Sequence, residues 1–305
     1  MNLAPVALFV YARPDETQKT LIALRENFLA SQTSLFIFSD GPKNEIHNES
    51  VKSVRKIIKK ESKGFAKVEI IEREKNFGLA KSIIQGVTDV LNIFDRIIVL
   101  EEDLISSKNF LNFLNQSLIK YRDYKNVFSC TGYTYQIDIP KGYQYDNYFT
   151  PRCESLGWGT WKDRWAKFDW EVKDFKDFIK DKSLRKSFEE IGADLLGMLL
   201  KQQIGLLDSW AVRWCYTHFK HNAFCSYPTK SKIVHIGEGG LATHVKKENK
   251  ILFTELDSEL KTEFNFSDSV LFNDHIIKQF NQMFRKSLIK KIRTEYYLIK
   301  YNLRQ

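Results

Sequence analysis

The chain has 305 residues, of which 43% are hydrophobic and 14% aromatic, and its formal net charge is +9. This length and apolar content allow one large domain or two fused halves, and they exclude a disordered protein. No apolar run approaches the roughly 20 residues that a bilayer-spanning helix needs, and the N-terminus lacks a signal-peptide pattern, so we expect the mature chain in the cytoplasm.

The first part of the chain alternates strands and helices. An apolar strand at 4–11 is followed by Arg13-Pro14-Asp15, and Pro14 suits the first turn of a helix over 17–29. The next expected elements are a strand at 34–39, a helix at about 45–60, a strand at 68–72, a helix at 79–91, a strand at 96–100 and a helix from 109. Four strand–helix units in succession predict an α/β fold with a doubly wound, mostly parallel sheet.

Polar residues follow each of these strands: Arg13, Asp40, Asn76 and the acids Glu101-Glu102-Asp103. Because ligands of open α/β sheets bind at the carboxyl ends of the strands, we expect these side chains on one rim. Three adjacent acids repel one another unless a cation offsets their charge, and carboxylates suit Mn²⁺ or Mg²⁺, which commonly bridge a protein to substrate phosphates. The alternative is an acidic start to the helix from Asn109.

Four sequence blocks carry a resemblance to a known family. The dinucleotide motif GxGxxG after the first strand and the phosphate-loop motif GxxxxGK[ST] are absent. Instead the blocks IIVLEEDLISSKNFLNFL, SLGWGTWKDRW, LDSWAVRW and KIVHIGEGGLATH occur in that order. The stretch from residue 4 to about 246 resembles GT-A glycosyltransferases, in particular the inverting N-acetylglucosaminyltransferase I group and family 2-like bacterial glycosyltransferases. The resemblance implies a Rossmann-like GT-A fold with a nucleotide-sugar-binding half (1–130), a fused acceptor-binding and catalytic half (131–250) and a basic C-terminal helical segment (251–305).

This resemblance also assigns the donor-binding residues. It implies that Asp103 binds the metal and that Glu102 lies close to the donor ribose or sugar. The nucleotide-sugar-binding candidates are Arg13, Asp40, Asn76, Gly78, Lys81, Glu101 and Glu102. Two alternatives stay open, because Asp40 also suits an Asx-turn and Lys81 suits a plain helix surface.

An inverting transfer needs a general base on the side of the acceptor hydroxyl. Our candidate is Asp208, because a carboxylate among Leu206, Leu207 and Trp210 would be partly desolvated and therefore more basic. Asp208 also suits the cap of the helix that follows it, and a cap is compatible with catalysis. Asp194 is a weaker rival because it lacks aromatic neighbours.

Trp158, Trp161, Trp165 and Trp170 form the densest aromatic cluster in the sequence. Flat rings suit the apolar faces of sugars, although tryptophans at this spacing more often fill a core. We expect Trp161 or Trp165 in the core and Trp158 nearer the sugar. Trp210 is a further candidate for a sugar or acceptor contact, and Glu154 suits either donor hydroxyls or the surface.

The run Gly237-Glu238-Gly239-Gly240 predicts a mobile loop that orders over a bound nucleotide. In many GT-A enzymes a late histidine completes the metal shell. By this resemblance His244 or His235 is the second metal ligand, and an ordinary structural histidine is the alternative.

The basic residues are spread along the chain, with a local excess from Lys278 to Arg304. From Ile276 to Leu303, Lys and Arg alternate with Ile, Phe, Leu and Tyr. This pattern predicts either a helix on an anionic membrane surface or a C-terminal helix packed on the domain. The four cysteines, Cys130, Cys153, Cys215 and Cys225, lack CxxC spacing and are expected to be reduced core residues.

The sequence therefore predicts a metal-dependent inverting glycosyltransferase that uses Mn²⁺ or Mg²⁺. The expected donor is a nucleoside-diphosphate sugar, such as the UDP-sugar UDP-GlcNAc, and the expected acceptor is a surface-glycan or lipid-linked saccharide at the inner face of the plasma membrane. One rival is a sugar-phosphate nucleotidyltransferase, although the expected Gly-rich loop after the first strand is missing. The other is a non-catalytic basic protein that binds membrane or nucleic acid; we expect no nucleic-acid partner.

Overall fold

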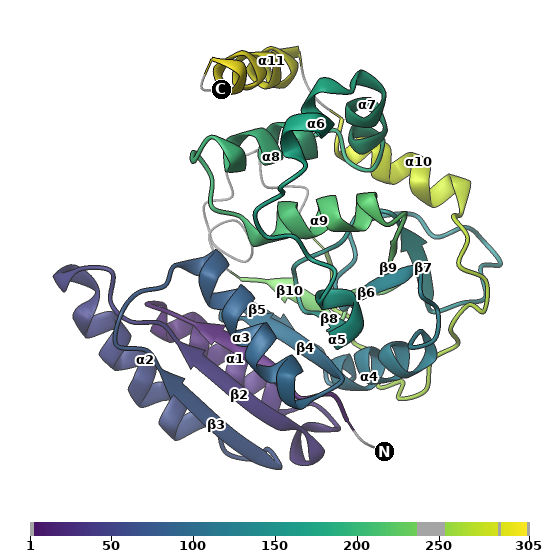
Figure 1. The fold of residues 1–305 in the computed structure, drawn as a ribbon. Coiled ribbons are helices and arrows are strands. Elements are labelled where there is room, and N and C mark those ends of the chain that lie inside the picture. Colours follow the sequence, from purple (N-terminus) through teal and green to yellow (C-terminus); the bar gives the residue numbers. More distant parts are fainter. Residues whose placement is uncertain (1–2, 237–253, 286–287, 304–305) are drawn as a thin grey trace.

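The computed structural model describes residues 3–236, 254–285 and 288–303. These residues form an α/β fold around an eight-stranded sheet with the order β3-β2-β1-β4-β8-β6-β9-β7 (Figure 1). Its strands are β1 (Val6–Val10), β2 (Ser34–Ser39), β3 (Lys67–Glu72), β4 (Arg96–Glu101), β6 (Val127–Thr131), β7 (Asn147–Thr150), β8 (Trp158–Trp161) and β9 (Phe224–Pro228). β7 and β8 run antiparallel to their neighbours, and the other strands all point the same way. The predicted mostly parallel sheet is confirmed.

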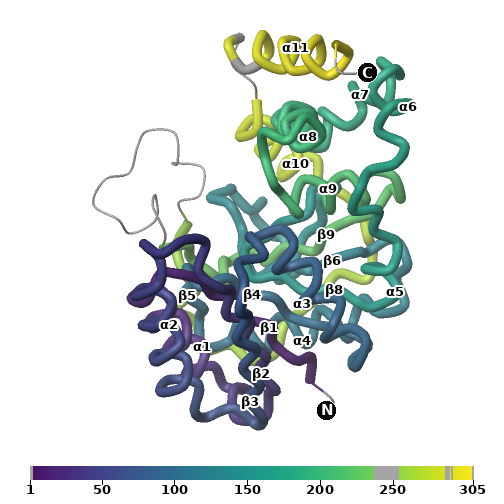
Figure 2. Tube along the Cα trace, turned by 60° about the vertical axis from the view of Figure 1, so that its left-hand side comes forward, coloured from purple at the N-terminus to yellow at the C-terminus, as the bar shows by residue number. Residues whose placement is uncertain are grey.

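Helices cover both faces of this sheet (Figures 1 and 2). One face packs against α1 (Pro14–Arg25), α2 (Asn48–Glu61) and α4 (Phe110–Lys120), and the other packs against α3 (Leu79–Ile93) and α9 (Trp210–Lys220). Within β1, Val6, Leu8 and Val10 face the first group, whereas Ala7 and Phe9 face the second. Successive side chains of a strand point to opposite faces, so a strand that is covered on both sides is apolar throughout.

The remaining elements are short or lie toward the end of the chain. α6, α7, α8 and α11 gather in the upper part of Figure 1, and β5 and β10 form a separate two-stranded sheet. The bounds are η1 (Ala30–Gln32), η2 (Glu45–His47), β5 (Leu104–Ser106), α5 (Lys162–Trp165), α6 (Phe175–Lys180), α7 (Lys182–Glu190), α8 (Leu195–Gln203), β10 (Ile233–His235), α10 (Asp274–Met283) and α11 (Leu288–Asn302). The predicted domain boundaries at residues 130 and 250 stay a prediction.

Trp158, Trp165, Trp210 and Trp214 pack in the core between the sheet and α9, whereas Trp161 packs on the other face of the sheet against α4. Trp161 and Trp165 are buried, as predicted. Trp158 is also fully buried, and its ring stacks on that of Trp210 at a centroid distance of 4.9 Å. The expectation that Trp158 and Trp210 contact the sugar is therefore wrong, because each ring is enclosed by other side chains. The four cysteines are free and buried, as predicted.

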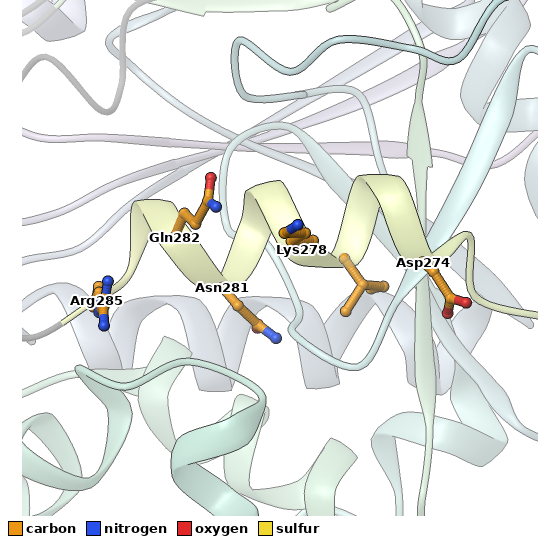
Figure 3. Close-up of a pocket in the computed structure, with 6 residues that line it drawn as sticks. Asp274, Lys278, Asn281, Gln282 and Arg285 are labelled. Carbon is orange, nitrogen blue, oxygen red and sulfur yellow. The ribbon is translucent and has the colours of Figure 1, made fainter.

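The C-terminal segment is two helices rather than one. α10 packs its apolar residues Ile276 and Phe280 into the core, while its outward side carries the polar residues that line an open hollow of about 400 Å³ (Figure 3). α11 packs against α8 with one face only. Packing on the domain, one of the two predicted alternatives, therefore describes α10. No helix in the described part of the chain is long and apolar enough to cross a membrane.

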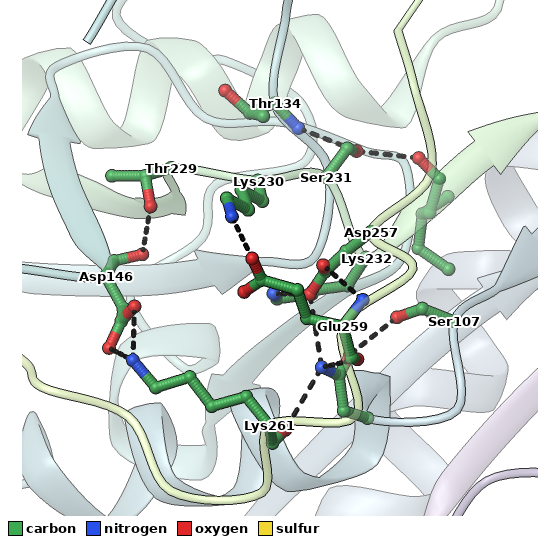
Figure 4. Close-up of polar contacts among 12 residues, drawn as sticks. Ser107, Thr134, Asp146, Thr229, Lys230, Ser231, Lys232, Asp257, Glu259 and Lys261 are labelled. Carbon is green, nitrogen blue, oxygen red and sulfur yellow. Dashed lines mark hydrogen bonds and ion pairs between the residues drawn. The ribbon is translucent and has the colours of Figure 1, made fainter.

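A mostly irregular segment, residues 254–273, precedes α10 and is held to the domain by a polar network (Figure 4). At its centre Lys232 forms an ion pair with Asp257, and their side chains are 5% and 1% exposed. Asn109 donates hydrogen bonds to the Asp257 carboxylate and to the carbonyl oxygens of Glu259 and Lys261 at 3.0–3.1 Å. The prediction that residues 251–305 are helical is therefore wrong for residues 254–273. Hydrogen bonds and ion pairs of side chains hold this stretch on the domain, although its backbone is not regular.

We predict that Asp257→Ala lowers the free energy of unfolding by about 3 kcal/mol, because it leaves the buried Lys232 ammonium without its partner. Glu259 lies on the same segment and forms an exposed ion pair with Lys230. Glu259→Ala should therefore lower the free energy of unfolding by less than about 1 kcal/mol. Equilibrium unfolding in urea measures both. Equal losses for the two variants would show that the buried pair does not anchor the segment.

Candidate functional site

A pocket of about 340 Å³ opens at the carboxyl ends of β1, β2 and β4. The side chains that were predicted on one rim come together here. The predicted residues that line it are Arg13, Asp40, Asn76, Gly78, Glu101, Glu102 and Asp103. Parallel strand pairing of β1 with both β2 and β4 is what aligns their ends. The roles of these residues in binding stay predictions.

Asp40 holds the backbone of the loop that forms one wall of the pocket. Its carboxylate accepts hydrogen bonds from the backbone N–H groups of Phe77 at 2.9 Å and Gly78 at 3.1 Å. It also accepts one from the next residue, Gly41, at 3.1 Å. Asn76 adds a bond from its Nδ2 to the Gly41 carbonyl oxygen at 2.8 Å. The ends of β2 and β3 are thereby locked together.

Glycine is required at two points of this wall. A Cβ on Gly41 would lie 2.5 Å from the carbonyl carbon of Lys75, so the two backbone segments approach too closely for a side chain. Gly78 has φ +74°, a left-handed conformation that other residues rarely adopt. Both glycines let the loop fold back against the end of β2.

Behind the loop, a buried cation supports it. The Arg73 guanidinium lies 4.5 Å from the centroid of the Phe77 ring and donates to the Ser82 hydroxyl and carbonyl oxygens. Burial lowers the pKa of Arg73. Lys81 lies outside on the exposed side of α3, with Nζ 4.8 Å from the same ring. Lys81 therefore has the position that the alternative interpretation predicted, on the helix surface beside the pocket.

The three acids at the end of β4, Glu101, Glu102 and Asp103, are partly buried, and their pKa values shift in different directions. Burial, reinforced by the neighbouring carboxylates, raises the pKa of Glu101 to about 8 and that of Glu102 to about 7. Burial acts in the same direction on Asp103, but hydrogen bonding with His235 and the charge of Arg13 outweigh it and lower the pKa of Asp103. Arg13 Nη1 lies 2.6 Å from Asp103 Oδ2. The pocket therefore holds more acid than its one nearby arginine can balance.

His235 reaches this pocket because β10 pairs with β5. In that antiparallel pair His235 lies opposite Leu104, the residue after Asp103. His235 Nε2 lies 3.0 Å from Asp103 Oδ2, and Nδ1 is buried without a hydrogen-bond partner in the described part of the chain. The other candidate, His244, and the predicted loop from Gly237 to Gly240 lie outside the described residues.

A divalent ion fits these residues. Among the described residues no three carboxylate, imidazole or thiolate groups form a ready-made metal cluster. Asp103 and His235 nevertheless supply an oxygen and a nitrogen side by side, and the unbalanced acids around them favour a cation. Ions such as Mg²⁺ usually bind to one or two protein carboxylates and complete their shell with water and substrate phosphates.

Asp208 lies beside Gly78, one of the residues that line the pocket, and is not itself among them. A Cβ on Gly78 would be 4.0 Å from Asp208 Oδ2, and Asp208 Oδ1 lies 3.3 Å from Arg213 Nη2. The Asp208 side chain is 66% exposed, so the expected desolvation by Leu206, Leu207 and Trp210 is wrong. Trp210 turns into the core and Leu206 is exposed. The cap of α9 is Ser209, whose Oγ accepts from the Val212 N–H at 3.3 Å, so the capping alternative for Asp208 is also wrong.

Two further acids turn out to be structural. Asp194 forms a two-pronged ion pair with Arg152, with distances of 2.7 and 3.1 Å. Glu154 is buried, and it accepts hydrogen bonds from the Tyr135 hydroxyl and, at 2.7 Å, from the Ser155 N–H. Glu154 is therefore neither at the surface nor among the residues that line the pocket, contrary to both expectations for it.

Six residues that line the pocket were not predicted, and three of them carry polar side chains: Tyr11, Lys43 and Ser82. The Tyr11 hydroxyl accepts a hydrogen bond from the backbone N–H of Lys43 at 2.9 Å, which joins the segments after β1 and β2. Tyr11 and Lys43 each follow a strand that ends at the rim, and this position is the signal that could have identified them.

No protein-family model matches the sequence, and no curated protein matches it. Among solved structures, S. aureus TarS has a TM-score of 0.43 and 9% identity over 77% of this chain and 37% of that chain. An active-site mutant of LgtC has a TM-score of 0.38 and 10% identity over 94% and 99%. UDP-glucose pyrophosphorylase has a TM-score of 0.35 and 13% identity over 77% and 94%. The chain spans about a third of the length of TarS.

We predict that Asp40→Ala exposes the backbone amides of Phe77 and Gly78 to hydrogen exchange. Loss of the carboxylate should lower their opening free energy by about 1–3 kcal/mol, because these partly buried N–H groups lose a charged acceptor. Hydrogen exchange followed by NMR measures this. Asp181→Ala is a matched control, since Asp181 accepts from two backbone N–H groups at the start of α7 and should affect only that helix. Unchanged exchange at Phe77 and Gly78 would contradict the role of Asp40 in holding the loop.

Proposed function

We propose that this chain is a metal-dependent inverting glycosyltransferase that transfers a sugar from a nucleoside-diphosphate sugar to a hydroxyl of a saccharide. The observation that carries the proposal is the set of three acids at the end of β4, opposed by Arg13 and His235, in a pocket at the carboxyl ends of parallel strands. Open α/β sheets bind nucleotides at such ends. The pocket volume of about 340 Å³ is within the usual range for small-molecule sites.

The walls of the pocket suit the parts of a nucleotide sugar. The Tyr11 ring is available to a flat base such as uracil, which is why we favour a UDP-sugar, with UDP-GlcNAc as the example. Lys43 and Arg13 bring positive charge to the diphosphate. The loop that Asp40 holds places the backbone around Gly78 next to the donor.

Asp103 and His235 would hold the divalent ion, Mn²⁺ or Mg²⁺, together with water and donor phosphate oxygens. The bound ion would stabilise the negative charge of the departing diphosphate. Glu101 and Glu102 would then lie beside the ribose and the sugar, where a protonated carboxyl can donate to a hydroxyl and a charged one can accept from it.

Asp208 is the proposed base. The acceptor hydroxyl oxygen forms a bond to the anomeric carbon, the bond from that carbon to the diphosphate oxygen breaks, and the electron pair stays on the diphosphate. The hydroxyl proton passes to the Asp208 carboxylate. Arg213, at 3.3 Å, orients this carboxylate beside the pocket. An exposed base leaves room for a long acceptor, which supports a surface-glycan or lipid-linked saccharide.

We predict that UDP binding depends on a divalent ion held by Asp103. Calorimetry of UDP in Mn²⁺ and in chelator should show affinity at least about tenfold higher in Mn²⁺ for the wild type, and a difference near zero for Asp103→Asn. Asp123→Asn, at an exposed acid remote from the pocket, is the matched control and should behave as the wild type. Equal affinity under all conditions would refute the metal assignment.

A second prediction concerns the base. Asp208→Asn should lower turnover by about a hundredfold or more and leave UDP affinity nearly unchanged, because the carboxylate acts on the acceptor proton. Glu190→Gln, at an exposed acid on α7, tests the loss of one surface charge and should retain full turnover. A screen of nucleotide-sugar hydrolysis with and without Mn²⁺ comes first, because it identifies the donor on which the turnover of both variants is measured. Near-normal transfer by Asp208→Asn would assign the base elsewhere.

A further inference from the structure

α11 presents an apolar stripe to solvent. It is the outermost helix in the upper part of both Figure 1 and Figure 2. Five large apolar side chains along it are strongly exposed: Ile289 (63%), Ile292 (62%), Tyr296 (57%), Ile299 (58%) and Leu303 (82%). They are spaced alternately by three and four residues, so they lie on one face of the helix. A contiguous apolar patch of this kind usually marks an interaction surface.

The opposite face of α11 fixes the direction of this stripe. Thr294 and Tyr301 are buried, and the Tyr301 ring meets Phe175 of α6 edge-on at 4.9 Å. At Gly197 of α8 a Cβ would lie 3.0 Å from Thr294 Oγ1, so the two helices approach closely at this point. The stripe therefore points away from the body of the protein.

Positive charge lies along one edge of the stripe, and Glu295, the one acid of the helix, lies along the other edge. The sequence of α11, LIKKIRTEYYLIKYN, has four basic residues and one acidic residue. Arg293 and Lys300 directly follow Ile292 and Ile299, which places both beside the stripe on the same edge. Long basic side chains in this position can extend from an apolar surface into a polar headgroup layer.

We infer that α11 docks the protein on an anionic lipid bilayer. The Ile, Tyr and Leu side chains enter the boundary between headgroups and acyl chains, and the basic residues attract the anionic headgroups. α10 takes no part, because Ile276 and Phe280 are buried and the hollow on its outward side is lined by five polar residues, Asp274, Lys278, Asn281, Gln282 and Arg285, with Ile277 as the one apolar member (Figure 3). The docking surface is thus confined to the last 15-residue helix and Leu303.

A second copy of the chain is the other occupant to consider. The spacing of the stripe matches a coiled-coil seam, but it covers only about two heptads, fewer than the three or four that favour a coiled coil. An antiparallel pair would also place Arg293 and Lys300 against the same residues of the other copy. A net charge of +9 on each chain further opposes self-association and favours an anionic surface.

The test uses the full chain and sedimentation with vesicles. At low salt the protein should sediment with vesicles of phosphatidylglycerol and phosphatidylcholine, bind weakly to phosphatidylcholine alone, and dissociate as salt rises. Ile292→Glu with Ile299→Glu should lower the partition coefficient by about a hundredfold, because two apolar contacts are lost. Ile93→Glu, on α3, changes a side chain that is 72% exposed and should have no effect.

A second variant guards against misfolding of the first. Arg293→Gln with Lys300→Gln keeps the stripe and should weaken binding to the anionic vesicles by about tenfold or more, with an unchanged urea midpoint. Absence of sedimentation at low salt, or equal binding to neutral and anionic vesicles, overturns the inference. So does a dimer in sedimentation equilibrium that the double glutamate variant abolishes, which would assign the stripe to a second copy. None of these readouts depends on the transfer reaction.

Discussion

The Asp103 carboxylate joins three parts of the protein that are distant in sequence. It follows β4, lies 2.6 Å from Arg13 after β1, and lies 3.0 Å from His235 of β10. Each contact requires its strand to be paired, β1 with β4 and β10 with β5. The acids are adjacent in the sequence, but the cations that offset their charge arrive only through tertiary structure. The carboxylate can therefore be buried with its charge compensated only when both sheets have formed.

The second requirement is a fixed distance between Asp208 and the pocket that Asp103 lines. β8 runs antiparallel to both β4 and β6 and thereby joins the two parts of the large sheet. Trp158 of β8 lies opposite Val99 of β4, and its ring stacks on Trp210, the first residue of α9. The buried tryptophans thus tie the start of α9, next to Asp208, to the strand that carries the acids. Their role is support of the site from behind rather than contact with a sugar.

Local pattern predicted the first half of the fold well and the environment of single residues poorly. The strand at 34–39 and the helix start at Leu79 match the structure, because hydrophobic periodicity and loop residues are local signals. Burial of Asp208 failed as a prediction, since neighbours such as Leu206 turn outward in the fold. The choice between His235 and His244 stayed open because the pairing of β10 with β5 has no local signal. Tyr11 and Lys43 were missed although both follow rim strands.

One close helix contact links two surfaces of the molecule. α8 receives α11 at Gly197, and at its other end Gln202 Oε1 accepts a hydrogen bond from the backbone N–H of Ser209 at 2.7 Å. Ser209 is the residue after Asp208 and the cap of α9. The same helix, α8, therefore supports α11, which carries the exposed apolar stripe, and fixes the position of Ser209 beside the proposed base. A shift of α8 would therefore move both the proposed docking helix and the residue next to the proposed base.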